Sequence, residues 1–459
     1  MLRLGLQPDV VTFTTLIKGL CSQSKVPQAL SLFDDMVGNG YQPDLIIYNT
    51  ILNGLCKIGV TDKAVRLLRM MEQRGLQPDV FSYSTIIDSL CKDRLLREAF
   101  ELFSEMKAKG TSPNVVTYNS LIHAMCNSGQ LNEAKRFLDE MVASDIALNV
   151  FTYNILVDAF CREGMVSEAE NIIIDKMIKQ GIEPDVVTYS ALIDGYCWQN
   201  DMDGTRRVFE MMSKKGCAPS IISCNIIING YCKTKRLDEA TKLFNEISQK
   251  GPLPDTVTYN TLIQGMFRLG RLFAAEELYR KMCSLEQVPN LMTYSIMLDG
   301  LCKHGKIVEA LKLFEAMKKS GLEPNDVHYN ILIDGMIEAG KFEVAREIFS
   351  YIFHNKLKPT VFTYNIMMKG LCMEGLLDEA YEIFMKIEEN GCSPDNFSYN
   401  VMIRGLLQKN DISRAMKLIH EMVDEKGFEA DIYAATRFVD LILQDGNEHL
   451  CSKILRRNL

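Results

Sequence analysis

Apolar and polar residues follow one pattern that recurs twelve times between Val10 and Asp431. The stretch 115–149 shows the pattern: VVTYNSLIHAMCNSGQLNEAKRFLDEMVASDIALN. Apolar residues recur at helical spacing in roughly positions 2–13 and again in roughly positions 17–29 of this unit, and a turn with glycine separates the two segments. We therefore expect each unit to form a pair of short amphipathic helices, helix A and helix B.

The repeats follow one another end to end, and most close with Gly-x-x-Pro-Asp or a variant, which stops a helix and turns the chain. Ten repeats have 35 residues, and two have one more. We place the extra residue in the second helix of 150–185 (AENIIIDKM) and in the closing loop of 396–431 (DEKGFEAD). The twelve repeats are 10–44, 45–79, 80–114, 115–149, 150–185, 186–220, 221–255, 256–290, 291–325, 326–360, 361–395 and 396–431.

The two ends of the chain differ from these units. Residues 1–9, MLRLGLQPD, match the end of a repeat, so we expect them to be the remnant of a truncated upstream repeat, with any targeting peptide missing as well. Residues 432–459 lose the pattern, and we expect one or two capping helices there.

A single helix pair buries little apolar surface, whereas twelve stacked pairs create a continuous core. Position 20, in helix B, is alanine in every repeat except 186–220, which has Thr205, and such a small side chain lets two helices approach closely. The sequence therefore predicts an all-α solenoid. No run of eighteen apolar residues occurs, so we expect no membrane-spanning helix.

Fourteen cysteines invite the question of metal or disulfide chemistry. Neighbouring repeats would hold equivalent cysteines about 10 Å apart, which is too far for a disulfide. No pair has zinc-ligand spacing, so we expect free, buried thiols and no metal or cofactor. Nine of the cysteines occupy position 12: Cys21, Cys56, Cys91, Cys126, Cys161, Cys197, Cys232, Cys302 and Cys372.

Catalytic motifs are missing from the pattern. The six histidines occupy unrelated repeat positions, and the glycines mark turns rather than a phosphate-binding loop. We therefore expect no enzyme. The net charge of −8 does not by itself indicate nucleic-acid binding, so evidence for that function has to come from particular positions.

The repeats read VTYNxLIxGLCKxGxLDEAxxLFxEMxxxGxxPD, which closely resembles the pentatricopeptide repeat of plant organelle RNA-binding proteins. The tetratricopeptide unit fits less well, because it has 34 residues and a tryptophan pattern that is absent here. The uniform units resemble the P class, and the Leu-Cys-Lys phrasing looks most like the restorer-of-fertility-like group. The resemblance implies a right-handed superhelix that binds single-stranded RNA, one base per repeat.

The resemblance also assigns roles to three positions: positions 5 and 35 select the base, and apolar position 2 sandwiches it. The selecting pairs, in chain order, are Thr14 and Asp44, Asn49 and Asp79, Ser84 and Asn114, Asn119 and Asn149, Asn154 and Asp185, Ser190 and Ser220, Asn225 and Asp255, Asn260 and Asn290, Ser295 and Asn325, Asn330 and Thr360, Asn365 and Asp395, and Asn400 and Asp431. The sandwiching residues are Val11, Ile46, Phe81, Val116, Phe151, Val187, Ile222, Val257, Met292, Val327, Phe362 and Phe397.

The residue types suit base selection. Asp only accepts hydrogen bonds, as the ring N–H of uracil or guanine requires, whereas Asn can donate to the ring nitrogen of adenine or cytosine. The resemblance adds that Asn at position 5 goes with pyrimidines and Ser or Thr with purines. The expected target is about 5′-GUACU(A)UCA(Y)UU-3′, with weak assignments opposite 186–220 and 326–360. Core packing of position 2 and a turn role for position 35 remain alternatives.

Positive charge for the RNA backbone would come from position 13, and solvation of a helix end is the alternative. This row is interrupted in the last three repeats, so we expect a weaker grip there. Its members are Lys57, Lys92, Arg162, Lys233, Arg268 and Lys303.

Two functions remain open. The first is sequence-specific binding of organellar single-stranded RNA by a monomer, in the mitochondrion or alternatively the chloroplast, which alters RNA processing, stability or translation, with or without recruited processing factors. The second is a peptide-binding helical scaffold of the tetratricopeptide type.

Overall fold

The computed structural model describes residues 9–285, 287–354, 357–428 and 436. Asp431, the remnant 1–8 and, apart from Thr436, the predicted capping helices of 432–459 lie outside the described residues. The chain divides into two compact units, Met1–Gly230 and Tyr231–Leu459, and the boundary falls within helix α13 (Ile221–Lys233).

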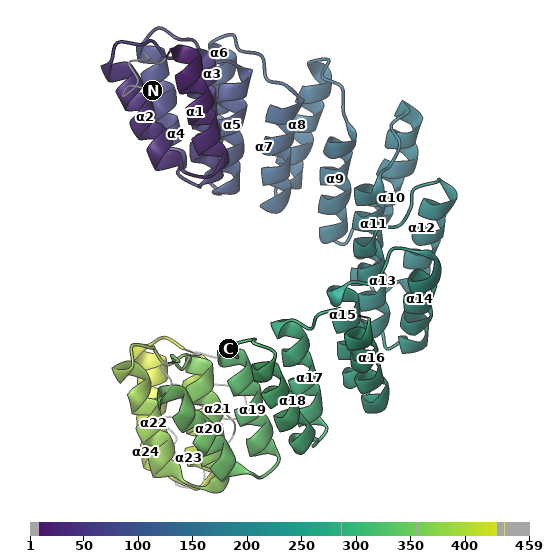
Figure 1. Ribbon diagram of the computed structural model, residues 1–459, viewed down its shortest axis with the longest axis vertical. Coiled ribbons are helices and arrows are strands. Elements are labelled where there is room, and N and C mark those ends of the chain that lie inside the picture. The colour runs from purple at the N-terminus through teal and green to yellow at the C-terminus, as the bar shows by residue number, and fades with distance from the viewer. Residues whose placement is uncertain (1–8, 286, 355–356, 429–435, 437–459) are drawn as a thin grey trace. The chain divides into compact units, whose positions relative to one another are not determined.

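The first unit consists of helices in tandem, coloured from purple to blue-green in Figure 1. Each A helix has 13 residues and occupies positions 1–13 of its repeat. The helices are α1 (Val10–Ser22), α2 (Val26–Gly38), α3 (Leu45–Lys57), α4 (Thr61–Gln73), α5 (Val80–Lys92), α6 (Leu96–Ala108), α7 (Val115–Asn127), α8 (Leu131–Ala143), α9 (Val150–Arg162), α10 (Val166–Asn171), η2 (Ile172–Met177), η3 (Ile178–Gln180), α11 (Val186–Trp198) and α12 (Met202–Lys214).

The second unit repeats the arrangement, coloured from teal to yellow in Figure 1. After α13, its helices are α14 (Leu237–Lys250), α15 (Thr256–Arg268), α16 (Leu272–Ser284), α17 (Leu291–Lys303), α18 (Ile307–Lys319), α19 (Asp326–Glu338), α20 (Phe342–His354), α21 (Val361–Glu374), α22 (Leu377–Glu389), α23 (Asn396–Gln408), α24 (Ile412–His420) and η4 (Glu421–Glu425).

Within each unit, an A helix packs against its own B helix and against the A helix of the next repeat, as α5 does with α6 and α7. Ala99 at position 20 of helix α6 is fully buried, and so is Thr205, which replaces the alanine in α12. The predicted all-α solenoid of tandem repeats is confirmed. Its right-handed twist stays a prediction.

The turn between the two helices depends on a left-handed residue at position 15. Glycine supplies it in seven repeats, as Gly59 does with φ of 70°. Five repeats place another residue there, and Arg94 adopts φ of 61°. A side chain in this conformation is strained, so the turn is fixed by the packing of the two helices as well as by local preference.

Both 36-residue repeats lengthen helix B. In 150–185 the extra residue produces the π-helix Ile172–Met177, and in 396–431 it produces the π-helix Glu421–Glu425. The placement of the second insertion in the closing loop was wrong, because the helix absorbs the residue before left-handed Gly427. This glycine lies at position 32 instead of the usual position 31, and that shift could have located the insertion from the sequence.

The cysteines within the described residues are free, but the expected burial holds only in part: Cys283 is exposed, and the buried ones are Cys161, Cys197, Cys224, Cys232, Cys302 and Cys372. Position 12 packs against the small residue at position 10 of the next repeat: a Cβ built on Gly265 would lie 2.4 Å from Cys232 Sγ. Burial raises the pKa of the Cys91 and Cys161 thiols to about 12, so these groups stay protonated. Position 12 is therefore a packing position.

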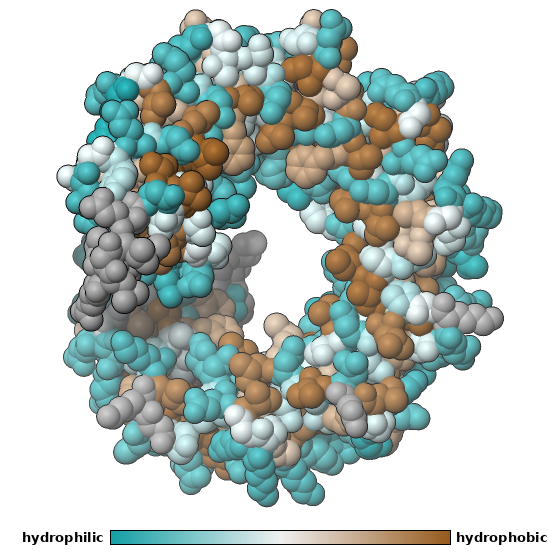
Figure 2. All heavy atoms as spheres, turned by 45° about the horizontal axis from the view of Figure 1, so that its top comes forward, coloured by the Kyte–Doolittle hydropathy of each residue, from teal (hydrophilic) through white to brown (hydrophobic). Residues whose placement is uncertain are grey.

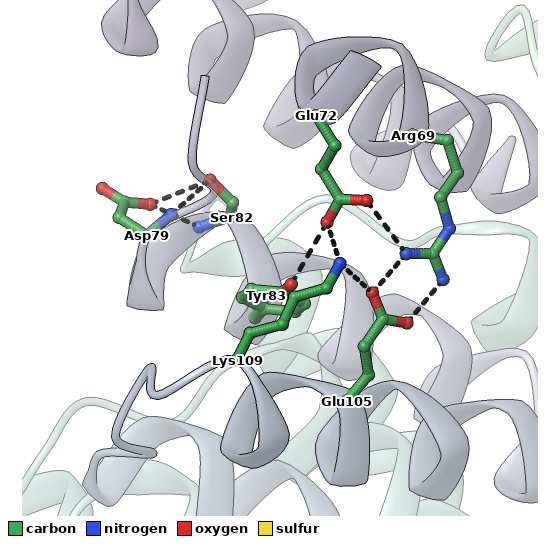
Figure 3. A network of polar contacts seen from close by, with 7 residues as sticks. All are labelled: Arg69, Glu72, Asp79, Ser82, Tyr83, Glu105 and Lys109. Carbon is green, nitrogen blue, oxygen red and sulfur yellow. Dashed lines mark hydrogen bonds and ion pairs between the residues drawn. The ribbon is translucent and has the colours of Figure 1, made fainter. Parts of the chain in front are cut away.

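Charged side chains link the B helices of neighbouring repeats. Figure 3 shows one such network, between α4 and α6. Glu105 accepts hydrogen bonds from both terminal nitrogens of Arg69, one of them at 2.6 Å. Lys109 Nζ lies 2.6 Å from carboxylate oxygens of both Glu72 and Glu105. The network bridges two repeats on the side formed by their B helices.

We expect the stability contributed by this network to depend on pH. Hydrogen bonds from Arg69 lower the pKa of Glu105 from its ordinary 4.5 to about 2. A lowered carboxyl pKa stabilises the folded state above pH 4.5, and this stabilisation is lost as the pH falls from 4.5 towards 2. Glu105→Gln should cost about 1 kcal/mol at neutral pH, because the pair is only partly buried, and almost nothing near pH 2.

Urea unfolding followed by circular dichroism across this pH range measures both effects. The control is Glu101→Gln, which removes a more exposed carboxylate paired with Arg97 and should change the unfolding midpoint very little. If Glu105→Gln lowered the free energy of unfolding equally at pH 7 and pH 2.5, the ionised Glu105 carboxylate would not be the source of this stability.

Candidate nucleic-acid interface

Position 35 caps the A helix of the following repeat. Asp79 shows the geometry: its Oδ1 accepts hydrogen bonds from the backbone N–H of Ser82 and from the Ser82 hydroxyl, both at 2.8 Å (Figure 3). Asn149 and Asp185 cap α9 and α11 in the same way, through Thr152 and Thr188. Of the predicted position-35 residues, Asp431 alone lies outside the described residues.

Capping fixes which atom of position 35 faces the helix. In Asn149, Oδ1 accepts from Thr152 N at 2.9 Å and from Thr152 Oγ1 at 3.0 Å, so the amide NH₂ group points away from the helix. An Asp at this position is anchored through Oδ1 in the same way. Its second carboxylate oxygen, Oδ2, takes the place of the outward amide NH₂ group. The cap thus converts Asn or Asp into an outward donor or an outward acceptor.

Ionised aspartate is favoured at two of the caps, Asp185 and Asp395. Burial disfavours the charge on Asp185, but hydrogen bonds from Thr188 and Asn154 outweigh it and lower the pKa of this carboxyl group. Asp395 is lowered in the same way: burial opposes the charge, whereas hydrogen bonds from Ser398 and Asn365 favour it. At neutral pH, both carboxylates therefore accept hydrogen bonds and cannot donate them.

Position 5 lies next to this cap. Asn49 Nδ2 is 3.2 Å from Asp79 Oδ1, and Asn154 Nδ2 is 3.2 Å from Asp185 Oδ1. The structure therefore brings the two predicted selecting residues into contact in these repeats. Asn365 and Asp395 form the third such bond, at 3.3 Å.

Buried position 3, which the sequence analysis did not single out, joins the pair. The Thr152 hydroxyl lies 2.8 Å from Asn119 Oδ1 and 3.0 Å from Asn149 Oδ1, and its single proton can point to either oxygen, so one hydroxyl links both selecting residues of repeat 115–149. Ser82 does the same for Asn49 and Asp79. The recurrence of Ser or Thr three residues after position 35 is the capping-box signal that could have found it.

Position 2 is exposed in all twelve repeats, and the exposed fraction of the residue runs from 47% in Val327 to 70% in Val11. These residues lie in the first turn of each A helix, beside the cap. Core packing, the alternative explanation for apolar residues at this position, is therefore wrong. Figure 2 shows exposed apolar side chains as brown areas among the teal hydrophilic surface.

A pocket in the second unit gathers all three predicted positions. It has a volume of about 350 Å³, and its lining includes Val327 and Phe362 from position 2 of adjacent repeats, Asn330 from position 5 and Thr360 from position 35. Lys303 from position 13 lines the same pocket. A planar group bound between Val327 and Phe362 would have Asn330 and Thr360 as the polar residues at its edge.

The predicted backbone cations are exposed at the end of each A helix, but three of them form ion pairs with an aspartate one turn earlier in the same helix. Lys92 pairs with Asp88, Arg162 with Asp158 at 2.9 Å, and Lys303 with Asp299 at 2.9 Å. Their side chains are 55–73% exposed, so they stay accessible to an anion.

The position-13 cations end with Lys303 in the ninth repeat, and the weaker grip expected of the last three repeats stays a prediction, although cations occur there at another position. The last two repeats carry Lys369 and Arg404 at position 9, one helical turn before position 13. Both line a pocket of about 820 Å³ together with Asp395, Phe397 and Asn400. The sequence analysis followed position 13 alone and therefore missed them.

The described part of the chain contains no cluster of three or more His, Cys, Asp or Glu residues that could hold a metal ion. Among the same residues, no helix combines the length and apolar character needed to span a bilayer.

The fold and the site together define a class: a solenoid of helical hairpins in which each repeat presents a capped polar pair beside an exposed apolar side chain. The chain belongs to the PPR repeat family, whose pattern covers most of its length. The PPR repeat family pattern matches residues 43–92, 78–127, 113–162, 149–197, 184–223, 219–268, 254–303, 289–336, 324–373 and 361–408, and related PPR repeat patterns match 4–37 and 397–426.

No curated protein sequence matches the chain. Among solved structures, the pentatricopeptide repeat protein PPR10 from maize shares 23% identity and has a TM-score of 0.55, over 100% of this chain and 74% of that chain. PPR10 in complex with an 18-nt psaJ RNA element gives 24% identity and a TM-score of 0.39, over 99% and 85%. Yeast Rmd9p in complex with a 16-nt target RNA shares 14% identity and has a TM-score of 0.44, over 85% of this chain and 83% of that chain.

Proposed function

We propose that this protein binds single-stranded RNA in a sequence-specific manner, with one base held at each repeat between successive position-2 side chains. The observation that carries the proposal is the exposure of all twelve apolar position-2 residues beside a capped polar pair. Exposed apolar side chains at one repeated position provide stacking surfaces for bases. The PPR10 and Rmd9p structures with bound RNA support the same choice of ligand.

The cap geometry supplies a physical basis for selection. Asp at position 35 turns an acceptor outward, and Asn turns a donor outward, whereas position 5 lies within hydrogen-bonding distance of the same edge. The proposed target remains about 5′-GUACU(A)UCA(Y)UU-3′, read from the first repeat to the last.

The small set of residue types at position 35 lends less support than the sequence alone suggested. Asp, Asn, Ser and Thr are the residues that helix N-caps favour, so capping explains why no Lys, Glu or Gln occurs there. The proposal therefore depends on the exposed position 2 and on the contact between positions 5 and 35.

The biological role belongs to the same proposal. A protein that occupies a defined RNA segment blocks nucleases or competing structures without catalysis, and we propose this role for an organellar transcript, in the mitochondrion or alternatively the chloroplast. The Leu-Cys-Lys phrasing of the repeats is the support for a restorer-of-fertility-like role in RNA processing, stabilisation or translation.

Binding by the full chain should follow the target sequence. In gel-shift titrations, GUACUAUCACUU should bind more tightly than the same bases scrambled, and changing the second base from U to C should weaken binding about tenfold, as expected for one hydrogen bond. Asp79→Asn should restore binding to the C-containing probe, because it replaces an outward acceptor by a donor. Affinity should fall as salt rises, since phosphate contacts release counterions.

The matched control is Asp145→Asn, which makes the same chemical change in the loop after α8, away from the A-helix caps. This variant should leave the preference for U over C at the second base of the probe unchanged. Equal affinity for all probes would refute sequence reading at this repeat. A folded protein that binds none of them would favour the peptide-binding scaffold instead.

A further inference from the structure

Trp198 is the single tryptophan of the chain and ends helix α11 at position 13 of repeat 186–220. Earlier repeats place a cation at this position, namely Lys57, Lys92 and Arg162. Tryptophan is highly buried on average, yet Trp198 is 59% exposed. Among the exposed aromatic residues of the described A helices, it alone lies away from position 2. An exposed indole in a row of cations therefore points to a contact with a ligand.

The end of helix α11 is held in place on both sides of Trp198. Cys197 packs against the next A helix, since a Cβ built on Gly230 would lie 2.7 Å from Cys197 Sγ. Gln199 donates from Nε2 to the carbonyl oxygen of Gly164 at 2.6 Å, which joins this helix end to the turn of the preceding repeat. The indole therefore projects from an anchored helix end.

Two pockets of the second unit show what position 13 of a repeat faces. Lys303 lines the pocket of about 350 Å³ together with Val327, which is position 2 of the next repeat. Met373, an uncharged residue at position 13, lines the pocket of about 820 Å³ together with Phe397, again position 2 of the next repeat. Position 13 of a repeat therefore borders the proposed nucleotide site of the repeat that follows.

The selecting pair of repeat 186–220 offers a base few hydrogen-bonding groups. Ser190 Oγ donates its single proton to the carbonyl oxygen of Val186 at 2.6 Å, so this hydroxyl can only accept from a ligand. Ser220 Oγ accepts from the backbone N–H of Ser223 at 3.1 Å, and both hydroxyls lie 2.9 Å from Ser223 Oγ. A further contact from Trp198 would hold the RNA where the polar pair is weakest.

We propose that Trp198 is a further RNA-binding residue, whose indole packs against a ribose and donates its N–H to a phosphate between the nucleotides held at repeats 186–220 and 221–255. Position 13 lies about 16 Å along the helix from position 2, so it faces the ribose–phosphate backbone rather than the base. The indole is uncharged, so the contact depends neither on base identity nor on counterion release. This inference rests on the proposed RNA-binding function.

The first test uses the intrinsic fluorescence of the full chain, which reports on Trp198 alone because no other tryptophan is present. Saturation with GUACUAUCACUU should lower the acrylamide quenching constant at least about twofold, since the RNA covers the ring. An unchanged quenching constant in the RNA-bound protein would overturn the inference.

The second test uses substitutions. Trp198→Ala should weaken binding about tenfold, equally for GUACUAUCACUU and for the probe with C at the second base, and should leave the salt dependence unchanged. Trp198→Lys should recover the affinity at low salt and steepen the slope of log affinity against log salt by about 0.7, as expected for one more phosphate contact on a single strand.

The matched control is Phe273→Ala, which removes an 80% exposed aromatic side chain from helix α16 and should leave the affinity within about threefold of the original. Thermal unfolding followed by circular dichroism checks that each variant is folded.

The outcomes separate this inference from the proposed function. If Trp198→Ala bound RNA as tightly as the unchanged protein, and both preferred the target to scrambled RNA, the inference would be overturned and the proposed function would stand. If target and scrambled RNA bound equally and both shielded Trp198 from acrylamide, sequence reading would be overturned and the backbone contact would stand. A folded chain that binds none of the probes would overturn both.

Discussion

Replacing four position-2 phenylalanines by alanine (Phe81, Phe151, Phe362 and Phe397) should reduce RNA affinity by about a thousandfold or more without unfolding the protein. Stacking of a base on an aromatic ring is worth about 1–3 kcal/mol, and four separate sites give at least about 4 kcal/mol. The side chains are 49–61% exposed, so their removal should change stability little. Filter binding with GUACUAUCACUU, together with thermal unfolding followed by circular dichroism, measures the two effects.

A matched control removes as many exposed apolar side chains from the B helices. Val142, Phe273, Val308 and Met385 are 53–80% exposed and lie in α8, α16, α18 and α22. Their joint replacement by alanine should leave RNA affinity within about threefold of the original, because they lie outside the proposed site. Should both quadruple variants bind equally well, position 2 would not be the stacking surface.

Helix positions were largely predictable from the sequence because the pattern is repeated twelve times. Helix A was expected at roughly positions 2–13 and α3 covers positions 1–13, whereas helix B was expected at roughly 17–29 and α4 covers 17–29. Because the same pattern recurs in every repeat, a residue that departs from it in one repeat, such as Arg94 in a left-handed turn, does not obscure the helix positions.

Exposure was harder to predict than helical structure. Val257, Leu262 and Phe267 all fit one apolar periodicity of helix A, yet Val257 is 56% exposed and the other two are buried. Periodicity assigns a residue to a face of the helix, but it does not show whether a neighbouring repeat covers that face near its end. Only the packed structure separates the exposed position 2 from the core.

Hydrogen-bond geometry was only partly accessible from the sequence, because a capping-box pattern indicates a helix cap but not which atom of the capping residue is anchored. That position 35 is a helix cap, with one atom anchored and one outward, follows from the contacts of Asp79 and Asn149.

Gly265→Ala is expected to be the most destabilising of the small substitutions considered, by about 1–3 kcal/mol. The added methyl group would lie 2.4 Å from Cys232 Sγ and 2.9 Å from Cys232 Cβ, closer than real Cβ contacts allow. Because adjacent A helices touch at this point, the helices must separate or the cysteine must shift. The urea unfolding midpoint of the full chain reports the loss.

The first repeat offers an internal control for this substitution. Gly19 occupies the same position in α1, but nothing lies within 4 Å of a Cβ placed there. Gly19→Ala should therefore stabilise the protein by about 0.5–1 kcal/mol, as expected for alanine in a helix interior. The double variant Cys232→Ala with Gly265→Ala should lose less stability than the two single changes added together. Stabilisation by Gly265→Ala would contradict the proposed close contact.

The two π-helices have a consequence for the proposed one-base-per-repeat reading of RNA. Both extra residues lengthen helix B, whereas the A helices α9 and α23 of the same repeats keep 13 residues, with Asn154 and Asn400 at the usual position 5. Under the proposed function, a residue gained in helix B would therefore be silent for decoding, because position 5 does not move along its helix. A residue gained in the first turn of helix A would act as a frameshift within that repeat, since it would rotate position 5 away from its cap by about 100°.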